Sequence, residues 1–574
     1  MKQACIKLAV LMAISAPVWG LVSEVSAADS VMPQTAQQEQ LDIARQRAEA
    51  RDERNRTERV EIEGIPTSMA EEQAVDEGGP SFFITHIELD SGKDTDVLAH
   101  EFTFLVPLVS QAEQQSMNVG QIETLVKSIN EALINRGFIT SQVRIPEQNI
   151  ESGTLRLALI PGRLGRVIYS EGSLTPSWQS AFPVREGDVL NVRRLEQGLE
   201  QMKRVRSQDV TMKLLPGDTV GITDVELTVT KAGARAHGVF SVDNSGLRNT
   251  GRSQVNASVV LDQPFNANDI VRGNIGLDGN RMGYEGGTRN QSISYSIARG
   301  WDTFSMYYGA YNYHQQVMSH PYSFISRSRV HTARVTWDHV YHRSQHTKAA
   351  YDVTLHKRTS HVYINDMEIP VQAMDTTALE LGLSQRKYIG NATVYMRVGQ
   401  KMGVGWLEAQ DEIGGKDIPS TRYHQWLLDV EYMKPLTLGH RPATYKANFH
   451  GQWTAGHKRL YGVDQISIGN RYTVRGFDGE YTLSGEQGWY IQQELSSHIP
   501  SLDSEVYVGL DVGVVYGVST DILVGRTIAG AALGLRGQSK SGVGYDVYVG
   551  APIYKPSGYH TKRVDVAAMV YYAW

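Results

Sequence analysis

Cysteine is nearly absent from this chain of 574 residues. The one cysteine, Cys5, lies in a segment with the features of a secretory signal, residues 1–27. Without that segment the mature chain has no thiol, which excludes disulfide bonds and cysteine-ligated metals. Cys5 also precedes the apolar part of the segment, so it comes too early to be the lipid-bearing cysteine of a lipoprotein.

The signal segment has its three parts in the usual order. Lys2 and Lys7 give a positive start, and an apolar stretch follows from Leu8 to Trp19. The small residues Val25-Ser26-Ala27 then offer a cleavage site before Ala28. This order predicts export from the cytoplasm, and the alternative is a buried N-terminal helix.

Long hydrophobic runs are missing as well. Hydrophobic residues make up 41% of the chain, yet no uninterrupted apolar stretch is long enough for a transmembrane helix. A membrane protein of this composition must cross with β-strands in a closed barrel, because alternation of apolar and polar residues hides its hydrophobicity.

Motifs of common enzyme classes are also absent. There is no nucleotide-binding loop of the Walker type and no His-Glu-x-x-His motif, and no catalytic triad can be chosen from so long a chain. Several histidines fall between residues 331 and 346, but His342 and His346 lie roughly 13 Å apart along a strand, too far for one metal. The net charge of −6 comes without long blocks of one sign, which argues against nucleic acid as a partner. We therefore expect that the protein is not an enzyme and that it binds neither a cofactor nor a metal.

Two-residue alternation, in contrast, runs from residue 233 to residue 574. In Thr444–Trp453, for example, apolar residues occupy every second position and polar residues the positions between. A strand between lipid and water needs this period. About sixteen such strands follow one another, which predicts a mainly β fold with a 16-stranded antiparallel transmembrane barrel. The terminal aromatic, Trp574, suits recognition by barrel-assembly machinery, or it is simply the end of the last strand.

Four parts are predicted between the signal and the barrel. They are a polar helix in residues 28–59, a linker in residues 60–80, and two α+β units in residues 81–162 and 163–232. The helix has only Leu41 and Ile43 as sizeable apolar residues, so it cannot bury a stripe against a core. It is either a solvated tail or a helix lodged in a wet channel.

The two α+β units share one order of elements: strand, helix, strand, strand. In the first unit, Asn118 and Gln121 predict a capping box at the start of the helix. In the second unit, Asn191 predicts the helix cap. The repetition indicates two copies of one small domain.

One segment of the barrel region, Ile466–Tyr481, breaks the strand pattern, and Val474-Arg475-Gly476-Phe477 stands at its centre. With this motif the chain resembles the two-partner secretion transporters, outer-membrane proteins that export haemolysins, filamentous adhesins and contact-dependent-inhibition toxins. Pro146–Leu155 also resembles a signature of the family's first POTRA domain, and Leu195–Glu200 with Leu215-Pro216-Gly217 resembles its second. The resemblance implies that the α+β units are periplasmic POTRA domains. It also implies that the motif lies on the sixth extracellular loop, folded back into the barrel.

In that family the loop arginine pairs with an aspartate in a Phe-x-Asp-x-Gly motif. The matching positions here are Asp511 and Gly513, while Gly509 stands where the family has Phe. Alternation along Val506–Val514 independently turns Asp511 toward the lumen. The resemblance implies an Arg475–Asp511 pair, and two separately solvated charges are the alternative.

The strand edge beside each POTRA helix can accept an extended peptide as an added strand. The resemblance implies that these domains bind unfolded cargo, with Gln148, Gly153, Leu195 and Gly198 as candidate contacts. The alternative is that the edges are merely exposed, or covered by the neighbouring domain.

The function implied by the resemblance is transport across the cell outer membrane, with the POTRA domains in the periplasm. One large exoprotein (an adhesin, a haemolysin or an inhibition toxin) would be recognised through its N-terminal secretion domain and exported without ATP, and the polar helix would plug the resting pore. Outer-membrane lipids and, during biogenesis, the barrel-assembly machinery are the other expected partners. The alternative is a barrel-assembly factor that inserts outer-membrane proteins, whereas a diffusion porin has no use for two periplasmic domains.

Overall fold

The computed structural model describes residues 34–56, 62, 80–92, 95–248, 250–279, 287–319, 322–415 and 418–574. The predicted signal with Cys5 lies outside the described residues, as does the predicted linker except for Ile62 and Pro80. Within the described ranges no helix is both long and apolar enough to cross a membrane.

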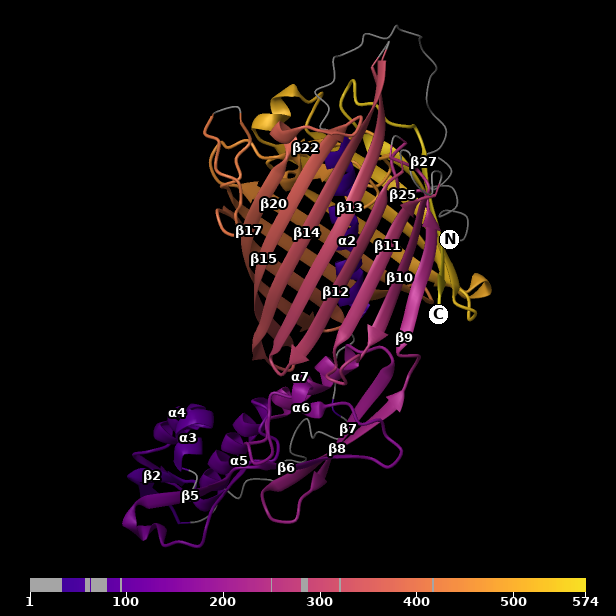
Figure 1. Ribbon diagram of the computed structural model, residues 1–574. Coiled ribbons are helices and arrows are strands. Elements are labelled where there is room, and N and C mark those ends of the chain that lie inside the picture. The colour runs from indigo at the N-terminus through magenta and orange to yellow at the C-terminus, as the bar shows by residue number, and fades with distance from the viewer. Residues whose placement is uncertain are drawn as a thin grey trace. The chain divides into compact units, whose positions relative to one another are not determined.

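A closed barrel of sixteen long antiparallel strands forms the C-terminal part of the protein, which confirms the predicted fold (Figure 1). The last strand pairs with the first through residues such as Tyr572 and Phe240. The strands of the wall are β9 (Ala236–Asp243), β10 (Gln254–Asp262), β11 (Ile270–Asp278), β12 (Arg289–Arg299), β13 (Asp302–Ser319), β14 (Tyr322–Arg343), β15 (Thr347–Ile364), β17 (Met374–Ile389), β18 (Ala392–Val404), β19 (His424–Leu438), β20 (Arg441–Thr454), β23 (Gln487–Ile499), β24 (Ser504–Tyr516), β25 (Thr527–Gln538), β26 (Val543–Tyr554) and β27 (Asp565–Ala573). A two-residue strand, β16 (Met367–Glu368), only extends the hairpin after β15.

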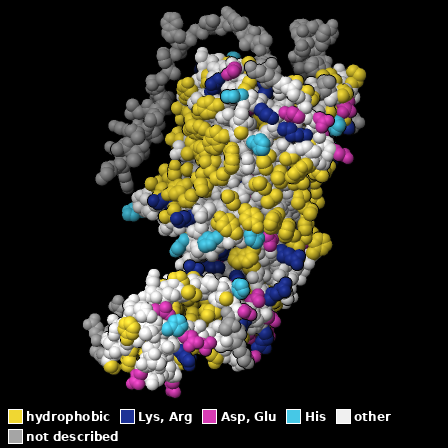
Figure 2. Space-filling view, turned by 90° about the vertical axis from the view of Figure 1, so that its left-hand side faces the viewer, with side chains coloured by type: hydrophobic (Ala, Val, Ile, Leu, Met, Phe, Trp, Pro, Cys, Tyr) yellow, Lys and Arg dark blue, Asp and Glu magenta, His cyan; other side chains and the backbone are white. Residues whose placement is uncertain are grey.

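Side chains alternate between the two faces of the wall. On β24, Val508 and Leu510 are about half exposed, while Asp511 is 4% exposed. Figure 2 shows apolar side chains gathered in a band over the outside of the barrel, with charged side chains above and below the band. Contact with lipid accounts for an exposed apolar surface of this kind.

The polar helix is α2 (Gln34–Arg56), and it lies inside the barrel (Figure 1). Its side chains contact strands around the wall, among them β13, β19 and β23. A helix that is polar on all sides has no apolar stripe to bury, and a polar lumen can satisfy its hydrogen-bonding groups. The helix is therefore lodged in the lumen and is not a solvated tail.

The first α+β unit is more helical than predicted. Its elements are β1 (Phe82–Ile84), β2 (His86–Asp90), α3 (Thr95–Glu101), η1 (Thr103–Leu105), α4 (Val106–Gln111), β3 (Gln115–Met117), α5 (Val119–Asn135), β4 (Gln142–Arg144), η2 (Ile150–Ser152) and β5 (Thr154–Ile160). The predicted capping box is confirmed: Gln121 N donates to Asn118 Oδ1 at 2.8 Å, and Asn118 N donates to Gln121 Oε1 at 2.9 Å. Helices α3 and α4 were not predicted, because an apolar run such as Phe102–Val109 does not distinguish a buried helix from a strand.

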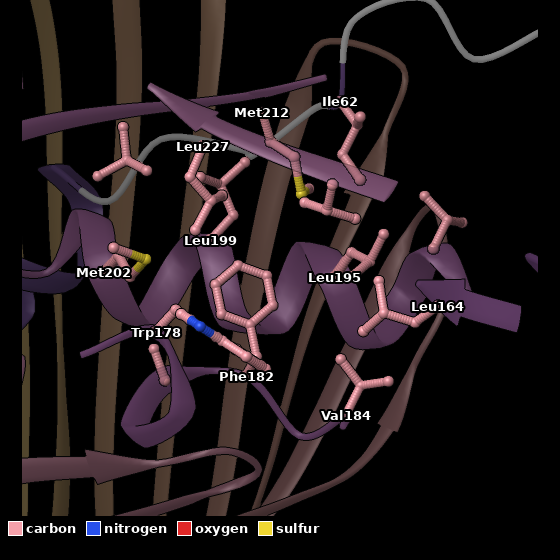
Figure 3. Packing of buried hydrophobic residues seen from close by; sticks show 14 of the residues in the cluster. Ile62, Leu164, Trp178, Phe182, Val184, Leu195, Leu199, Met202, Met212 and Leu227 are labelled. Atoms are coloured by element: carbon pink, nitrogen blue, oxygen red, sulfur yellow. The ribbon is translucent and has the colours of Figure 1, made fainter. Parts of the chain in front are cut away.

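The second unit combines a long helix, a short helix and a three-stranded sheet. Its elements are β6 (Arg163–Tyr169), α6 (Trp178–Ala181), α7 (Val192–Lys203), β7 (Gln208–Pro216) and β8 (Ile222–Lys231). Asn191 caps α7, since its Oδ1 accepts from Arg193 N at 2.9 Å. Figure 3 shows Leu195, Leu199 and Met202 of α7 pointing into the core. Ile62 joins the same core and so connects the linker to this unit.

Candidate functional site in the barrel lumen

The chain between β20 and β23 folds back into the barrel. It forms a two-stranded sheet from β21 (Ile466–Ile468) and β22 (Leu483–Gly485), with the Val474–Phe477 motif between the two strands. We call residues 466–485 the inserted loop. Val474 and Phe477 are almost fully buried, and they belong to one apolar cluster with side chains of β23, β24 and β25. The tip of the loop is therefore packed against the inner wall.

The side chain of Arg475 extends from the inserted loop to the wall. Its Nε donates to Asp511 Oδ2 at 2.8 Å and its Nη2 to Asp511 Oδ1 at 2.9 Å, a bidentate contact. Its backbone N also donates to Asp511 Oδ2 at 2.8 Å, and its Nη1 donates to Glu494 Oε2 at 2.8 Å. The Arg475 side chain is 9% exposed and that of Asp511 is 0% exposed. The structure thus brings the two predicted residues into contact, away from solvent.

A second arginine extends this contact into a network that was not predicted. Arg536 Nη2 lies 2.9 Å from Glu494 Oε1, and Arg536 Nε donates to Glu505 Oε2 at 2.7 Å. Glu494 therefore joins Arg475 to Arg536. The available signal was the alternation of β23, which turns Glu494 inward, but alternation does not say which cation an inward carboxylate meets.

Glycines make room for the tip of the loop. Gly476 has φ +93°, and a Cβ there would lie 2.5 Å from Ala551 O of β26. Gly513 faces Val474 and Ile468, which a Cβ would approach to 3.0 Å and 3.1 Å. A Cβ at Gly509 would lie 2.4 Å from Arg475 Nη2. The Arg475 guanidinium thus occupies the space into which a side chain at residue 509 would point.

The first turns of α2 contact extracellular loops. Gln37 Nε2 donates to Gly479 O of the inserted loop at 2.7 Å, and Gln40 Nε2 donates to Gly462 O. Thr250 Oγ1 in the loop after β9 donates to Gln38 Oε1 at 2.8 Å. The N-terminal end of α2 therefore binds backbone and side-chain groups at the extracellular end of the lumen.

The rest of α2 is held by ion pairs and hydrogen bonds to the wall. Arg358 of β15 donates Nε and Nη2 to the two carboxylate oxygens of Glu39, both at 2.7 Å. Tyr313 of β13 donates to Asp42 Oδ2 at 3.0 Å. Near the C-terminal end of α2, Arg54 pairs with Glu431 of β19. These contacts hold α2 lengthwise in the lumen, with its C-terminal end toward the periplasmic turns.

The helix α7 of the second unit contacts the periplasmic turns of the barrel. Arg343 at the end of β14 donates to Gln197 Oε1 at 2.9 Å and also contacts Glu200, which accepts from Lys348 too. Gln201 Nε2 donates to Thr303 Oγ1 at 3.2 Å. Burial alone would raise the pKa of Glu200, but the Lys348 ammonium and the Arg343 guanidinium hold it below its ordinary value.

The four predicted cargo contacts have structural roles in this conformation. The side-chain amide of Gln148 exchanges two hydrogen bonds with the backbone of Arg156, both at 2.7 Å, and so binds the part of β5 that lies beyond the end of β4. Gly153 has φ +79° at the end of η2. Leu195 is buried in the core, and a Cβ at Gly198 would lie 2.2 Å from the Phe182 ring. Their role in cargo binding stays a prediction.

Comparison with known families identifies all three folded parts. The model of the haemolysin secretion/activation protein ShlB/FhaC/HecB matches residues 221–537. The model of a ShlB-type POTRA domain matches residues 82–162, and a further POTRA model matches residues 163–216.

Individual relatives agree with these matches. The outer membrane transporter CdiB-2 of Burkholderia pseudomallei (strain 1026b) is 37% identical over 81% of this chain and 80% of its own length. The hemolysin transporter protein HpmB of Proteus mirabilis is 26% identical over 71% of this chain and 72% of its own length. The solved structure of CdiB from Acinetobacter baumannii superposes with a TM-score of 0.82 at 26% identity, over 95% of this chain and 100% of that one.

Proposed function

The chain belongs to the haemolysin secretion/activation protein family ShlB/FhaC/HecB, and we propose that it carries one dedicated large exoprotein from the periplasm to the cell surface. It is an outer-membrane transporter of the two-partner secretion class with periplasmic POTRA domains. The resemblance drawn from the Val474–Phe477 motif is thereby confirmed. The identity of the cargo, its recognition and the source of energy belong to the proposal.

The observation that carries this proposal is that two elements, the inserted loop and α2, lie in the lumen at once. The inserted loop is attached through Arg475 and Asp511, and α2 is attached through pairs such as Glu39 with Arg358. Both attachments include ion pairs and no covalent bond, so an arriving chain can replace them without unfolding the wall. In this scheme α2 is a plug that leaves the conduit, and the Arg475–Asp511 pair sets the position of the loop.

Cargo recognition is proposed for the strand edges of the POTRA domains. The sheet order of the first domain is β2-β5-β4 and that of the second is β6-β8-β7, so each sheet has two edge strands. An unfolded polypeptide can pair with such an edge through its backbone, which suits a receptor that accepts an extended segment. The N-terminal secretion domain of the exoprotein is the proposed ligand.

Export is proposed to need no ATP. A cargo that folds into repeats outside the cell gains stability with each added repeat, because each repeat packs on its neighbour. Folding outside the membrane then biases the movement of the chain through the conduit. The barrel-assembly machinery, which would insert the strands ending at Trp574, is the proposed partner in biogenesis.

The proposal is tested by secretion of a cognate exoprotein, to be sought beside the gene of this chain, using Arg475→Ala. Removing one member of a desolvated ion pair costs about 3–5 kcal/mol, and less where water enters. We expect a folded, heat-modifiable barrel that leaves the cargo in the periplasm. Lys458→Ala, at an exposed lysine in the segment before β21, is the matched control and should secrete normally.

The alternative function, insertion of other barrels, predicts a different result in the same strains. Loss of a barrel-assembly factor lowers the amounts of unrelated outer-membrane proteins, whereas loss of a dedicated exporter leaves them unchanged. Normal secretion by Arg475→Ala would show that export does not depend on the ion pair. A general loss of outer-membrane proteins in these strains would favour the alternative function.

A further inference from the structure

The outward face of strands β12 to β15 changes character along its length. On β14, Arg334 points inward, since its Nη2 donates to Gln46 of α2 at 3.0 Å. The odd-numbered neighbours therefore point outward, and Val335 and Trp337 are exposed to the lipid side. From His331 onward, toward the extracellular end, the outward residues of β14 are His331, Arg329 and Arg327.

The length of the apolar part places this change at the outer surface of the membrane. Tyr341, 57% exposed, is the last outward aromatic of β14 on the periplasmic side. Ten residues from Tyr341 to His331 span roughly 33 Å along a strand. With a strand tilt of about 40° this gives about 25 Å along the membrane normal, the height of the apolar band of such barrels. Arg329 then lies at the level of the lipid headgroups of the outer leaflet.

Basic residues of neighbouring strands share this level. Arg329 is in register with His361 of β15 on one side and with Asn312 of β13 on the other. Asn312 is in register with Arg289 of β12. We call Arg289, Arg327, Arg329, His331 and His361 the outer basic patch.

Part of the positive charge of the patch is compensated by the hairpin after β15. Arg327 pairs with Asp366 at 3.0 Å, and His361 pairs with Glu368 at 2.8 Å. Arg329 is different: it is exposed, its guanidinium lies 5.2 Å from the centre of the Tyr363 ring, and no acceptor among the described residues binds it. An exposed arginine beside a lipid surface has its charge satisfied only by water or by an anion from that surface.

We propose that the outer basic patch binds the phosphate groups of the glycolipid in the outer leaflet of the outer membrane. Arginine suits this ligand because its planar guanidinium matches phosphate through two parallel hydrogen bonds. The acyl chains of the same molecule lie along the apolar outward residues Val335 and Met306, which are opposite each other on β14 and β13. His331, whose ring stacks on Tyr308, marks the border between acyl chains and headgroup. This site is separate from the lumen and from the transport proposal.

The test is native mass spectrometry of the detergent-purified protein titrated with bisphosphorylated lipid A, dephosphorylated lipid A and inorganic phosphate. We expect the wild-type protein to retain bisphosphorylated lipid A in preference to the dephosphorylated form. Because a hydrogen bond to a charged group is worth a factor of roughly ten or more, Arg329→Gln with Arg327→Gln should weaken retention at least about tenfold. Lys387→Gln, at an exposed lysine near the periplasmic end of β17, is the matched control and should bind as the wild type does.

Heat-modifiable migration of each variant in gel electrophoresis shows that its barrel is folded. Equal retention of bisphosphorylated lipid A by the double variant and the wild type would overturn the proposal. So would equal binding of the dephosphorylated lipid, since the acyl chains alone would then explain the affinity. Binding of inorganic phosphate as tightly as the lipid would assign the patch to a soluble anion and would also overturn the proposal.

Discussion

At the scale of single residues, the Arg475 guanidinium lies beside a position that has no side chain. It occupies the space into which a side chain at residue 509 would point. Gly509→Ala puts a methyl group within 2.4 Å of Arg475 Nη2, so the guanidinium has to move from its two-point contact. We expect a folded barrel with at least several-fold less secretion, because overpacking of a well-filled site costs about 1–3 kcal/mol.

The same substitution elsewhere in the wall provides the control. A Cβ at Gly273 of β11 would meet no atom within 4 Å, so Gly273→Ala should secrete normally. Secretion measured as exoprotein in the medium distinguishes the two variants. If Gly509→Ala exports as well as Gly273→Ala, the close contact of Arg475 with residue 509 is not needed for secretion.

At the scale of elements, α2 is held in the lumen by ion pairs, and substitution can swap the two charges of a pair between the helix and the wall. The side chains of Glu39 and Arg358 are 10% and 15% exposed. Arg358→Glu sets two carboxylates against each other, which should displace the helix and increase the ion conductance of the purified protein in planar bilayers roughly several-fold. Combining it with Glu39→Arg restores opposite charges and should return the conductance toward the wild-type level.

Another acidic residue of α2 serves as the control for that experiment. Asp52 has a side chain that is 63% exposed, and Asp52→Arg should leave the conductance near the wild-type value. Equal conductance in the wild type, Arg358→Glu and a deletion of residues 34–56 would show that α2 does not close the conduit.

At the scale of the whole molecule, the second POTRA domain is attached to the barrel by a carboxylate that remains ionised in acid. The pKa of Glu200 is held below its ordinary value by Lys348 and Arg343, against the effect of burial. A depressed pKa gives stability that is present above the ordinary glutamate value, about 4.3, and is lost as the pH falls through the depressed pKa. We therefore expect the contact to persist from pH 8 to about pH 5 and to weaken only below about pH 4.

Cross-linking measures this contact directly. In a Cys5→Ser background, Gln201→Cys and Thr303→Cys replace two side chains that are joined by a hydrogen bond across the contact. The yield of cross-linked protein should fall with Glu200→Gln between pH 8 and about pH 5, where Glu200 is ionised, and the difference from the wild type should shrink below about pH 4. Lys203→Gln is the control on the same helix, because Lys203 is exposed and pairs with Asp209 of its own domain. A yield that is unchanged by Glu200→Gln would exclude this carboxylate as the attachment.

Much of the barrel could be predicted from sequence because lipid and water impose one repeated pattern on every strand. The same pattern placed Asp511 on the inner face, and the Val474–Phe477 motif supplied its partner. The helix caps at Asn118 and Asn191 were predictable because each depends on groups only a few residues apart.

Contacts between inward polar residues could not be predicted in this way. Sequence alone does not tell whether water or another charge satisfies Glu431, Arg358 and Arg343, so it does not distinguish a solvated charge from a paired one. The contact of the Gln148 amide with the backbone of its own domain was likewise not predicted, and the contact of Gln148 with cargo stays a prediction. A side chain that binds the backbone where a neighbouring strand is missing follows no periodic sequence pattern. Only coordinates reveal such a contact.

The contacts that hold α2 in the lumen also determine how the closed state responds to temperature. Leu41 and Ala44 are the apolar side chains of the helix that are well buried, and the groups around the rest are polar. Withdrawal of the helix would expose little hydrocarbon, and hydration of apolar surface is the main source of a positive heat-capacity change. Exposure of polar surface lowers the heat capacity, so the heat-capacity change of opening should not be positive. A plot of the logarithm of the opening equilibrium constant against inverse temperature should then lack the upward curvature that withdrawal of a plug with a large apolar surface would produce.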